Sequence, residues 1–246
     1  MTCENAQMRR GHSISEHGLQ PTRAEGDTAA RAVAIDSSLG SERLELHVAR
    51  YEPGRSLPRA LDGIQEILYA VSGHGTLFID GEAHELEPRT GAYVAEGESY
   101  EVDNPGPETL LVVSATAPQE NGATPSARRT VRYDDQPSLP ASGDREFRYL
   151  VTDEVGCRDL TQFFGVIAPG RAPDHSHVYD EVIYVLEGQG TLHIDGEHEP
   201  VAAGTCIHLP PLREHSLENS GEGPMKVVAV FHPAGDPASR AYEANE

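Results

Sequence analysis

The chain has 246 residues, a length that suits one large domain or two domains of roughly 120 residues. Asp and Glu outnumber Lys and Arg by 40 to 19, which gives a formal net charge of -21. Because such a surface repels phosphate backbones and anionic membranes, we expect neither nucleic acid nor a membrane as a partner. The N-terminal sequence lacks the apolar segment of a signal peptide, and no apolar run reaches the ~18 residues of a membrane span. These features predict a cytoplasmic protein.

Short apolar segments alternate with turn residues along the whole chain. The composition includes 24 Gly and 18 Pro, and the segments between them are rich in Val, Ile, Leu and Tyr. Examples are Leu44–Arg50, Ile67–Val71, Thr76–Asp80, Leu110–Val113 and Val227–Phe231. Many short strands separated by Gly and Pro turns are typical of an all-β sandwich or barrel.

An internal repeat divides the chain into two similar halves. Residues Glu66–Glu82 and Glu181–Glu197 are identical at 10 of 17 positions without a gap. Self-similarity of this kind indicates a duplicated structural unit. We therefore predict an N-terminal barrel over residues 29–118 and a C-terminal barrel over residues 146–246. A linker rich in Pro, Ser and charge is expected over 119–145, and residues 1–28 have the composition of a poorly ordered segment.

Ligand-type side chains gather in the second half. His175 and His177 are two residues apart, so on an extended strand both side chains leave the same face, and Glu181 has the same parity. His215 follows a double proline that would end a neighbouring strand. Together these residues would form a site for one divalent transition metal such as Fe, Mn or Ni, with Zn, Co or Cu as alternatives. Four protein ligands would leave two positions open for water or substrate.

These residues lie in two stretches that resemble the cupin motifs. The segment from Gly170 to Gly188 has the Gly–HxH–Glu–Gly order of the first motif, and Gly204–Asn219 is similar to the second motif. The resemblance implies two tandem double-stranded β-helix (jelly-roll) barrels, an arrangement called a bicupin. It also implies that His175, His177, Glu181 and His215 are the metal ligands.

The first copy has lost most of this pattern. Glu66 aligns with Glu181, Ala60 and Asp62 fall near the two HxH positions, and Tyr100 falls on His215. Because the imidazoles are missing, we expect no transition metal in this half, although its glycines predict that it still folds. A second ligand pocket in the first barrel is an alternative.

Further candidates come from the residues near the motifs. His193 and His208 lie in predicted strands and could line the second barrel, and Tyr179 shares the parity of the ligands. The candidate catalytic residues are therefore Glu181, Tyr179, His193 and His208. Arg171 and Arg213 could hold a substrate carboxylate. Asp174 and Asp180 could accept hydrogen bonds from the N–H groups of the ligand imidazoles.

The resemblance leaves several functions open. A single-metal bicupin with three His and one Glu is most similar to the quercetinase-like dioxygenases, which predicts an oxidoreductase acting on a small hydroxylated or enolisable substrate. Bicupins resembling oxalate decarboxylase usually keep ligands in both copies, and this chain does not. An isomerase, epimerase or lyase that uses the metal as a Lewis acid is an alternative, as is a non-catalytic small-molecule-binding cupin. A homodimer is also consistent with the sequence.

Overall fold

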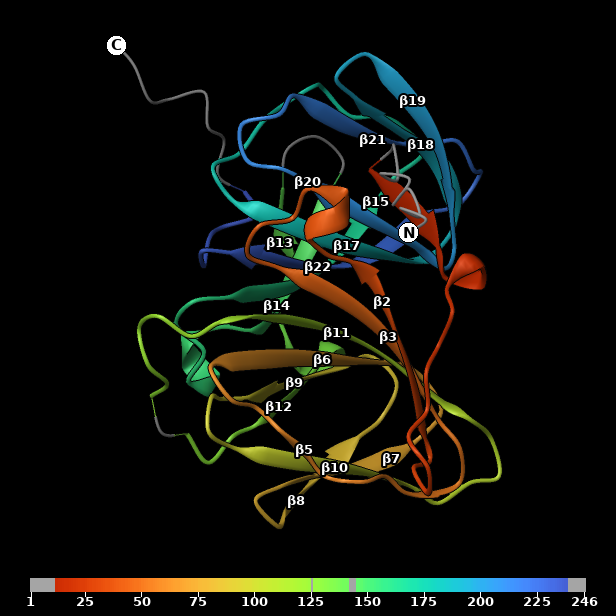
Figure 1. Cartoon of the computed structure of the whole chain (residues 1–246). Helices are drawn as coiled ribbons and strands as arrows, with labels where there is room; N and C mark the ends of the chain where they lie inside the picture. The colour runs from red at the N-terminus through yellow and green to blue at the C-terminus, as the bar shows by residue number, and fades with distance from the viewer. Residues whose placement is uncertain (1–11, 125, 142–144, 239–246) are drawn as a thin grey trace, which may run out of the picture.

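The computed structural model describes residues 12–124, 126–141 and 145–238, which form two β-barrels, one from each half of the chain (Figure 1). Both barrels are built from antiparallel strands, and the helical elements of the described residues are four 3-10 turns: η1 (Glu16–Gly18), η2 (Ser37–Leu39), η3 (Tyr133–Asp135) and η4 (Asp153–Val155). The predicted all-β fold with two tandem jelly rolls is confirmed. No helix of these residues is both long and apolar enough to cross a membrane.

The N-terminal barrel consists of two facing sheets. The larger has the strand order β12-β9-β6-β11-β3-β2, and the smaller has the order β4-β10-β7-β8 with β5 also paired to β10. The strands are β2 (Ala29–Ile35), β3 (Glu45–Tyr51), β4 (Gly54–Arg55), β5 (Arg59–Ala60), β6 (Ile64–Ser72), β7 (Gly75–Ile79), β8 (Glu82–Leu86), β9 (Thr90–Val94), β10 (Ser99–Asn104), β11 (Leu110–Pro118) and β12 (Thr130–Arg132).

The C-terminal barrel repeats this plan. Its larger sheet has the order β1-β20-β17-β22-β15-β14-β13, and its smaller sheet has the order β16-β21-β18-β19. The strands are β1 (Ser13–Ser15), β13 (Leu139–Pro140), β14 (Arg145–Val151), β15 (Thr161–Ile167), β16 (Gly170–Arg171), β17 (Asp180–Glu187), β18 (Gln189–Ile194), β19 (Glu197–Ala202), β20 (Thr205–Leu209), β21 (His215–Asn219) and β22 (Met225–His232).

The larger sheet of each barrel is buried on both faces (Figure 1). One face lines the interior of its own barrel, and the other face packs against the other barrel. Along β17, Ile183 belongs to the core inside the C-terminal barrel, whereas Val182 and Tyr184 belong to the core between the barrels. Tyr69 on β6 reaches the same shared core from the other side. Burial on both faces explains why these strands are continuous apolar runs in the sequence.

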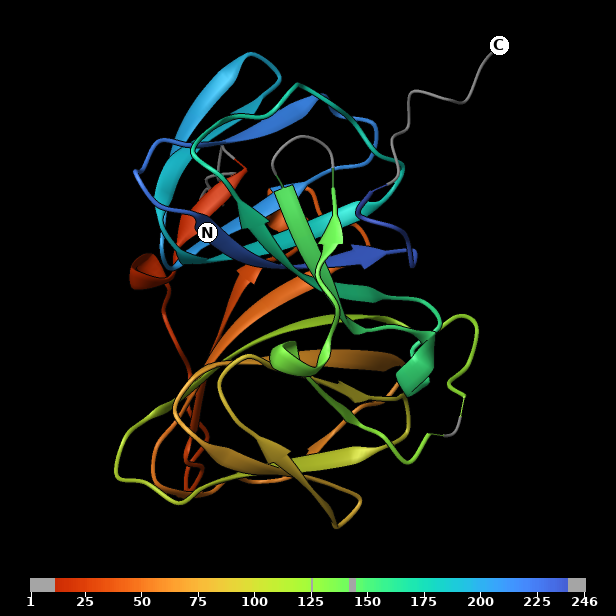
Figure 2. The same cartoon turned by 180° about the vertical axis from the view of Figure 1, so that it is seen from behind.

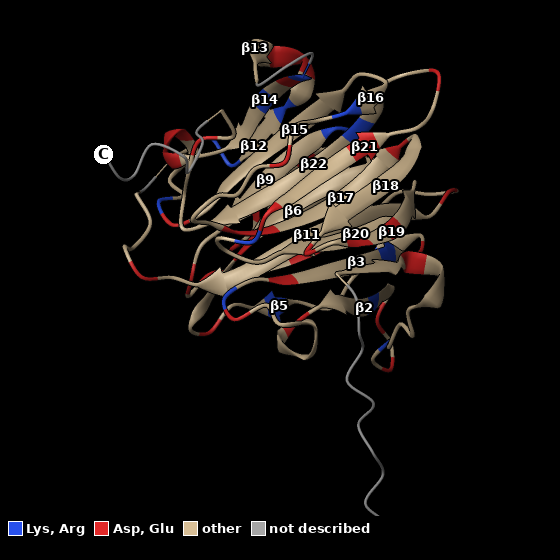
Figure 3. Ribbon diagram, turned by 90° about the horizontal axis from the view of Figure 1, so that it is seen from above, with Lys and Arg blue, Asp and Glu red and all other residues tan. Residues whose placement is uncertain are grey.

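Strands from outside the predicted barrels extend their sheets, and β13 of the predicted linker pairs with β14 in this way. β1 pairs with β20, so the N-terminal segment lies on the C-terminal barrel, and β12 from the predicted linker pairs with β9 of the N-terminal barrel (Figure 2). The segment predicted to be poorly ordered thus contributes a strand over Ser13–Ser15, and residues 1–11 lie outside the described residues. Charged residues are concentrated on loops and strand ends around the stacked sheets (Figure 3).

The close approach of β18 and β21 predicts the effect of a single methyl group. A Cβ added at Gly190 would lie 1.8 Å from the carbonyl oxygen of Glu218, so the two strands would have to separate. We expect Gly190→Ala to lower the free energy of unfolding by about 2–4 kcal/mol in urea denaturation. Gly223→Ala is the control, because no heavy atom lies within 4 Å of its added Cβ. Equal stability of the two variants would contradict this packing.

Candidate metal centre

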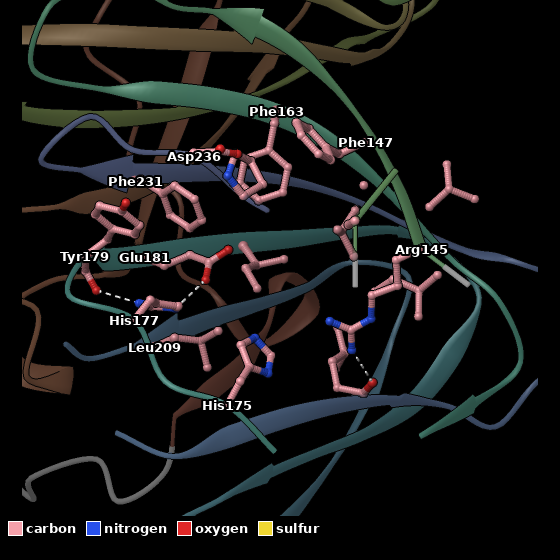
Figure 4. Close-up of a pocket in the computed structure, with 18 of the residues that line it drawn as sticks. Arg145, Phe147, Phe163, His175, His177, Tyr179, Glu181, Leu209, Phe231 and Asp236 are labelled. Atoms are coloured by element: carbon pink, nitrogen blue, oxygen red, sulfur yellow. Dashed lines mark hydrogen bonds and ion pairs between the residues drawn. The ribbon is translucent and has the colours of Figure 1, made fainter. Parts of the chain in front are cut away.

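A cavity of about 110 Å³ lies inside the C-terminal barrel, between the inward faces of its two sheets (Figure 4). Its polar lining brings together residues that are up to 91 positions apart in the chain: Arg145, Glu146, His175, His177, Glu181, His215 and Asp236. Its aromatic lining consists of Phe147, Phe163, Tyr179 and Phe231. The cavity is therefore a mainly apolar space that contains a group of polar side chains from both sheets.

Three of the predicted metal ligands form a compact set. The ligand atoms of His177, Glu181 and His215 all lie within 4.8 Å of one another, and the three residues are buried. Glu181 is the first inward-facing residue of β17, and His215 begins β21 on the opposite sheet. Because the two sheets face each other, residues from separate motifs meet at one point.

His175 lies beside this set. It pairs with His215 in an isolated antiparallel bridge, and the centroids of their two rings are 4.5 Å apart. His175 also lines the cavity, and its ring centroid is 6.5 Å from that of His177. The structure thus gathers all four predicted ligands, three in a compact set and His175 next to them.

Backbone carbonyls orient all three imidazoles. The Nδ1 atoms of His175, His177 and His215 lie 3.2, 2.9 and 2.9 Å, respectively, from a carbonyl oxygen two residues away in the chain. Since a carbonyl only accepts hydrogen bonds, Nδ1 carries the hydrogen, and a neutral ring then presents its Nε2 lone pair. This is the orientation in which histidine commonly binds a metal, with its other nitrogen held by an acceptor.

His177 has acceptors on both sides. Its Nε2 lies 2.9 Å from Oε2 of Glu181, and its Nδ1 faces the carbonyl of Tyr179. Burial alone would lower the pKa of His177, but the hydrogen bond and charge of Glu181 raise it above its usual value. A divalent cation between Nε2 and the carboxylate would take the place of that proton, so the pair fits a metal site.

The other two imidazoles are kept neutral. The pKa of His215 is lowered to about 3, first by burial and then by the neighbouring His175 and His177. Burial also lowers the pKa of His175. Neutral rings bind a metal without first losing a proton, so both are in the ligand form at neutral pH.

Two acidic residues expected to support the ligands have other partners. Asp180 accepts from Nε2 of His208 at 2.6 Å, and Asp174 pairs with Arg171 at 2.7 Å. Backbone carbonyls, and not these two acids as predicted, therefore accept hydrogen bonds from the ligand imidazoles.

The predicted catalytic residues divide into two groups. Glu181 and Tyr179 line the cavity, and the Tyr179 ring stacks on Phe231 with centroids 4.9 Å apart. His193 and His208 do not line it, because the neighbouring residues on their strands take the inward positions. His208 on β20 faces the other barrel, and His193 lies on the outer face of β18. The prediction that these two histidines line the cavity is wrong.

Arg145 is a cavity residue that the sequence analysis missed. It shares the inward face of β14 with Phe147, and Figure 4 shows its side chain approaching from the side opposite Tyr179. Its guanidinium donates to the carbonyl of Leu217 at 3.3 Å, and no carboxylate among the described residues forms an ion pair with it. Burial lowers its pKa, although the charge of Glu181 acts in the opposite direction. The sequence signal for this position was its two-residue spacing from Phe147, because residues two apart on a strand lie on the same face.

The two arginines proposed from the sequence as carboxylate ligands do not line the cavity. Arg171 pairs with Asp174, and Arg213 pairs with Asp195 at 3.3 Å. Exposed ion pairs of this kind have little effect on stability.

In the N-terminal barrel, arginines surround the equivalent glutamate. Glu66 is 0% exposed, and its carboxylate lies 3.0 Å from Arg59 and 3.8 Å from Arg31. Tyr100 and Ser114 donate hydroxyl hydrogen bonds to it at 3.0 and 2.6 Å. Burial would raise the pKa of Glu66, but Arg59 and Arg31 lower it below its usual value.

Strand register corrects the alignment of this degraded motif. Arg59 lies opposite Tyr100, just as His175 lies opposite His215. Arg59 therefore occupies the first HxH position in place of Ala60, and by the same two-residue step the buried Leu61 replaces Asp62 at the second. A guanidinium has no lone pair to offer a metal, which gives a physical reason for the expectation that this barrel binds none.

Comparisons with known proteins agree with the two-barrel structure. The Cupin_2 family (cupin domain) matches residues 47–116 and 163–231, once in each barrel and together over more than half of the chain. A putative glyoxylate-induced protein from Pseudomonas aeruginosa has a similar structure, with a TM-score of 0.78 at 16% identity over 100% of this chain and 95% of that one. A mutant oxalate decarboxylase from Bacillus subtilis has a TM-score of 0.74 at 13% identity over 92% and 78% of the two chains.

Several curated relatives match parts of the sequence. An uncharacterized protein of Methanocaldococcus jannaschii is 37% identical over 24% of this chain and 48% of its own length. An oxalate-binding protein of Thermotoga maritima is 28% identical over 36% and 76%, and the dimethylsulfoniopropionate lyase DddW of Ruegeria pomeroyi is 26% identical over 55% and 88%. The match spans about half the length of the first of these relatives. The resemblance to quercetinases is not confirmed by these comparisons.

Metal content should depend on the compact ligand set. We expect the protein to bind about one transition-metal ion in this cavity, and His215→Ala to abolish that binding because one of three converging ligands is lost. Elemental analysis after gel filtration measures the bound metal, and circular dichroism checks the fold. The control His84→Ala changes a half-buried histidine of the other barrel and should leave the metal in place. Unchanged metal in His215→Ala would refute the site.

The Glu66 cluster should affect stability without affecting metal. Glu66→Gln leaves Arg31 and Arg59 without their buried counter-charge, so we expect the free energy of unfolding at pH 7 to fall by about 3–5 kcal/mol. Because the pKa of Glu66 is lowered, the cluster stabilises the fold above about pH 4.3 and this contribution is lost as the pH falls further. Glu101→Gln, which removes a partly exposed partner of Arg55, is the control for urea unfolding. A large loss of bound metal in Glu66→Gln would contradict this assignment.

Proposed function

This chain belongs to the cupin domain family, and we propose that its C-terminal barrel is a metal-dependent enzyme that transforms a small carboxylate by lyase or decarboxylase chemistry. The observation that carries the proposal is the Arg145 guanidinium, which shares one buried cavity with His177, Glu181 and His215. The cavity thus combines a metal-type ligand set with one cation that has no carboxylate partner among the described residues.

The chain's own residues define how such a substrate would bind. His177, Glu181 and His215, with His175 beside them, would hold the metal through Nε2 and carboxylate oxygens. A bound divalent ion would supply Lewis-acid stabilisation of negative charge on substrate oxygens. Arg145 would form charge-assisted hydrogen bonds to the substrate carboxylate and fix its orientation. The weak hydrogen bond of Arg145 to Leu217 leaves other guanidinium donors for this contact.

The cavity walls restrict both water and substrate size. Phe147, Phe163 and Phe231 provide an apolar wall, which strengthens electrostatic interactions inside the site. Tyr179 lines the same wall, and among the described lining residues it alone brings a hydroxyl group, which is suited to hold or move a proton beside the substrate. A volume of about 110 Å³ favours a molecule of a few heavy atoms over a drug-sized one, for which pockets of about 300 Å³ or more are usual.

The names of three relatives agree with this substrate class. The oxalate-binding protein and the oxalate decarboxylase are named for oxalate, and the lyase is named for dimethylsulfoniopropionate. Both compounds are small carboxylates. These similarities are distant, so Arg145 and the ligand set remain the principal support.

A dioxygenase is the second candidate. Three imidazoles and one carboxylate would hold a metal that could bind a chelating substrate and O2 together. The cavity volume argues against a three-ring flavonol as that substrate, because such a molecule is drug-sized. A small enolisable substrate would still fit this candidate.

Carboxylate binding should depend on Arg145. In the metal-loaded protein we expect Arg145→Gln to weaken the binding of oxalate, malonate or acrylate about tenfold or more, because a charge-assisted hydrogen bond is lost. Isothermal titration with each acid measures this effect. Arg171→Gln removes an arginine of the same barrel that pairs outside the cavity, and it should change the affinity less than twofold. Equal effects of the two substitutions would contradict the role of Arg145.

Oxygen dependence separates the two candidate reactions. A lyase or decarboxylase that uses the metal as a Lewis acid should turn over a panel of small carboxylates equally well under argon and in air. Product formation is followed by NMR spectroscopy, with catechols and 1,3-diketones as the comparison panel. Turnover that stops under argon would favour the dioxygenase, and tight binding without turnover under either gas would favour a binding protein.

A further inference from the structure

We propose that the outer face of the C-terminal barrel carries a second transition-metal site, formed by His193 and His198. The two residues lie directly opposite each other on β18 and β19, the strands of a hairpin. Leu192 and Ile194 take the inward positions on β18, so this pair lies on the opposite side of the sheet from the cavity. Neither histidine is a ligand of the cavity site.

The hydrogen bonds of His193 fix which nitrogen is available. Its Nε2 lies 2.7 Å from Oε2 of Glu218, and the carboxylate can only accept, so Nε2 carries the hydrogen. In a neutral ring Nδ1 then presents a lone pair, and it faces Nδ1 of His198 at 2.8 Å. A carboxylate that holds the far nitrogen of an imidazole is the usual support of a metal-bound histidine.

The spacing of the two nitrogens suits adjacent positions around one metal. With metal–nitrogen bonds of about 2.0–2.1 Å, two neighbouring ligands lie about 2.9–3.4 Å apart. The observed 2.8 Å is close to the lower end, and the ring planes are inclined by 69° with centroids 4.6 Å apart. His198 is exposed and Glu218 adds negative charge, so a hydrated cation could reach the pair and keep water as its remaining ligands.

The internal repeat shows that this pair is specific to the second copy. The equivalent hairpin of the N-terminal barrel places Phe78 opposite Ala83 at the same register. Phe78 is the variable position of a Thr-Leu-x-Ile-Asp-Gly-Glu sequence that both copies share, and Ala83 follows that sequence directly. Both positions of the pair therefore carry imidazole in one copy and neither does in the other. A surface histidine present by chance would explain imidazole at one of these positions. Two imidazoles that meet across the hairpin indicate a metal site.

The chemistry of the donors defines the ligand. Imidazole binds the borderline divalent ions Zn, Cu and Ni, and the Irving–Williams order places Cu and Ni above Mn and Fe. With two protein ligands, the site would bind such an ion more weakly than the cavity, as an exchangeable second ion.

Replacement of the pair by its counterpart from the first copy gives the most direct test. The variant His193→Phe with His198→Ala reproduces the N-terminal hairpin, in which Arg55 lies 3.9 Å above the Phe78 ring. Arg171 occupies the position of Arg55 on the equivalent strand, so the introduced ring should be tolerated. Isothermal titration with Ni²⁺ is made on the protein as purified, with its cavity metal retained. His84→Ala, which removes a histidine from the other barrel's hairpin, is the matched control.

We expect the wild type and His84→Ala to bind one additional Ni²⁺ that the double variant binds at least tenfold more weakly. Paramagnetic broadening of the His193 and His198 resonances would locate the ion. The same binding should persist in His215→Ala, so the outer site is tested independently of the cavity and of the proposed function. Equal Ni²⁺ affinity in the wild type and in a double variant with an unchanged thermal midpoint would overturn the proposal, as would broadening confined to other histidines.

Discussion

The two-residue alternation of antiparallel strands determines which side chains meet in this molecule. In the C-terminal barrel it directs Arg145, Glu181 and His215 from three strands into one cavity. It turns His193 to the outer face of its sheet and the buried His208 toward the other barrel. A shift of one residue on any of these strands would turn its cavity-lining side chain to the opposite face of the sheet. The barrel therefore holds its register firmly, through apolar residues that share the inward faces with the ligands.

The two barrels solve the same electrostatic problem in different ways. Each contains a buried glutamate at the same place in its fold, and a buried carboxylate requires a compensating positive charge. In the N-terminal barrel, Arg31 and Arg59 supply that charge, and Leu61 takes the place of a ligand. In the C-terminal barrel, Glu181 faces His177 and two neutral imidazoles, a donor set suited to a divalent cation. After the duplication, arginines neutralise the buried glutamate of one barrel, and imidazoles suited to a metal surround that of the other.

The sequence predicted much of this arrangement and missed specific parts of it for physical reasons. The repeated glycines and the spacing of His175, His177, Glu181 and His215 were enough to predict two β-barrels and one ligand cluster. Spacing could not show which faces of short strands point inward, so His193 and His208 were placed in the cavity. Arg145 was missed because it lies at the boundary of a segment with linker composition, where no motif sets the register. The step from Arg59 to Glu66 is one residue longer than the step from His175 to Glu181, and this difference hid Arg59 until strand pairing revealed it.

We expect one metal ion between His177, Glu181 and His215, and none at the Glu66 cluster. Anomalous X-ray diffraction from crystals of the protein as purified, recorded above and below the absorption edge of the metal found by elemental analysis, tests this directly. We expect one strong anomalous peak within coordination distance of the Nε2 atoms and the Glu181 carboxylate, and none beside Glu66. A peak in the N-terminal barrel, or a fully bound ion that avoids the C-terminal cavity, would contradict it.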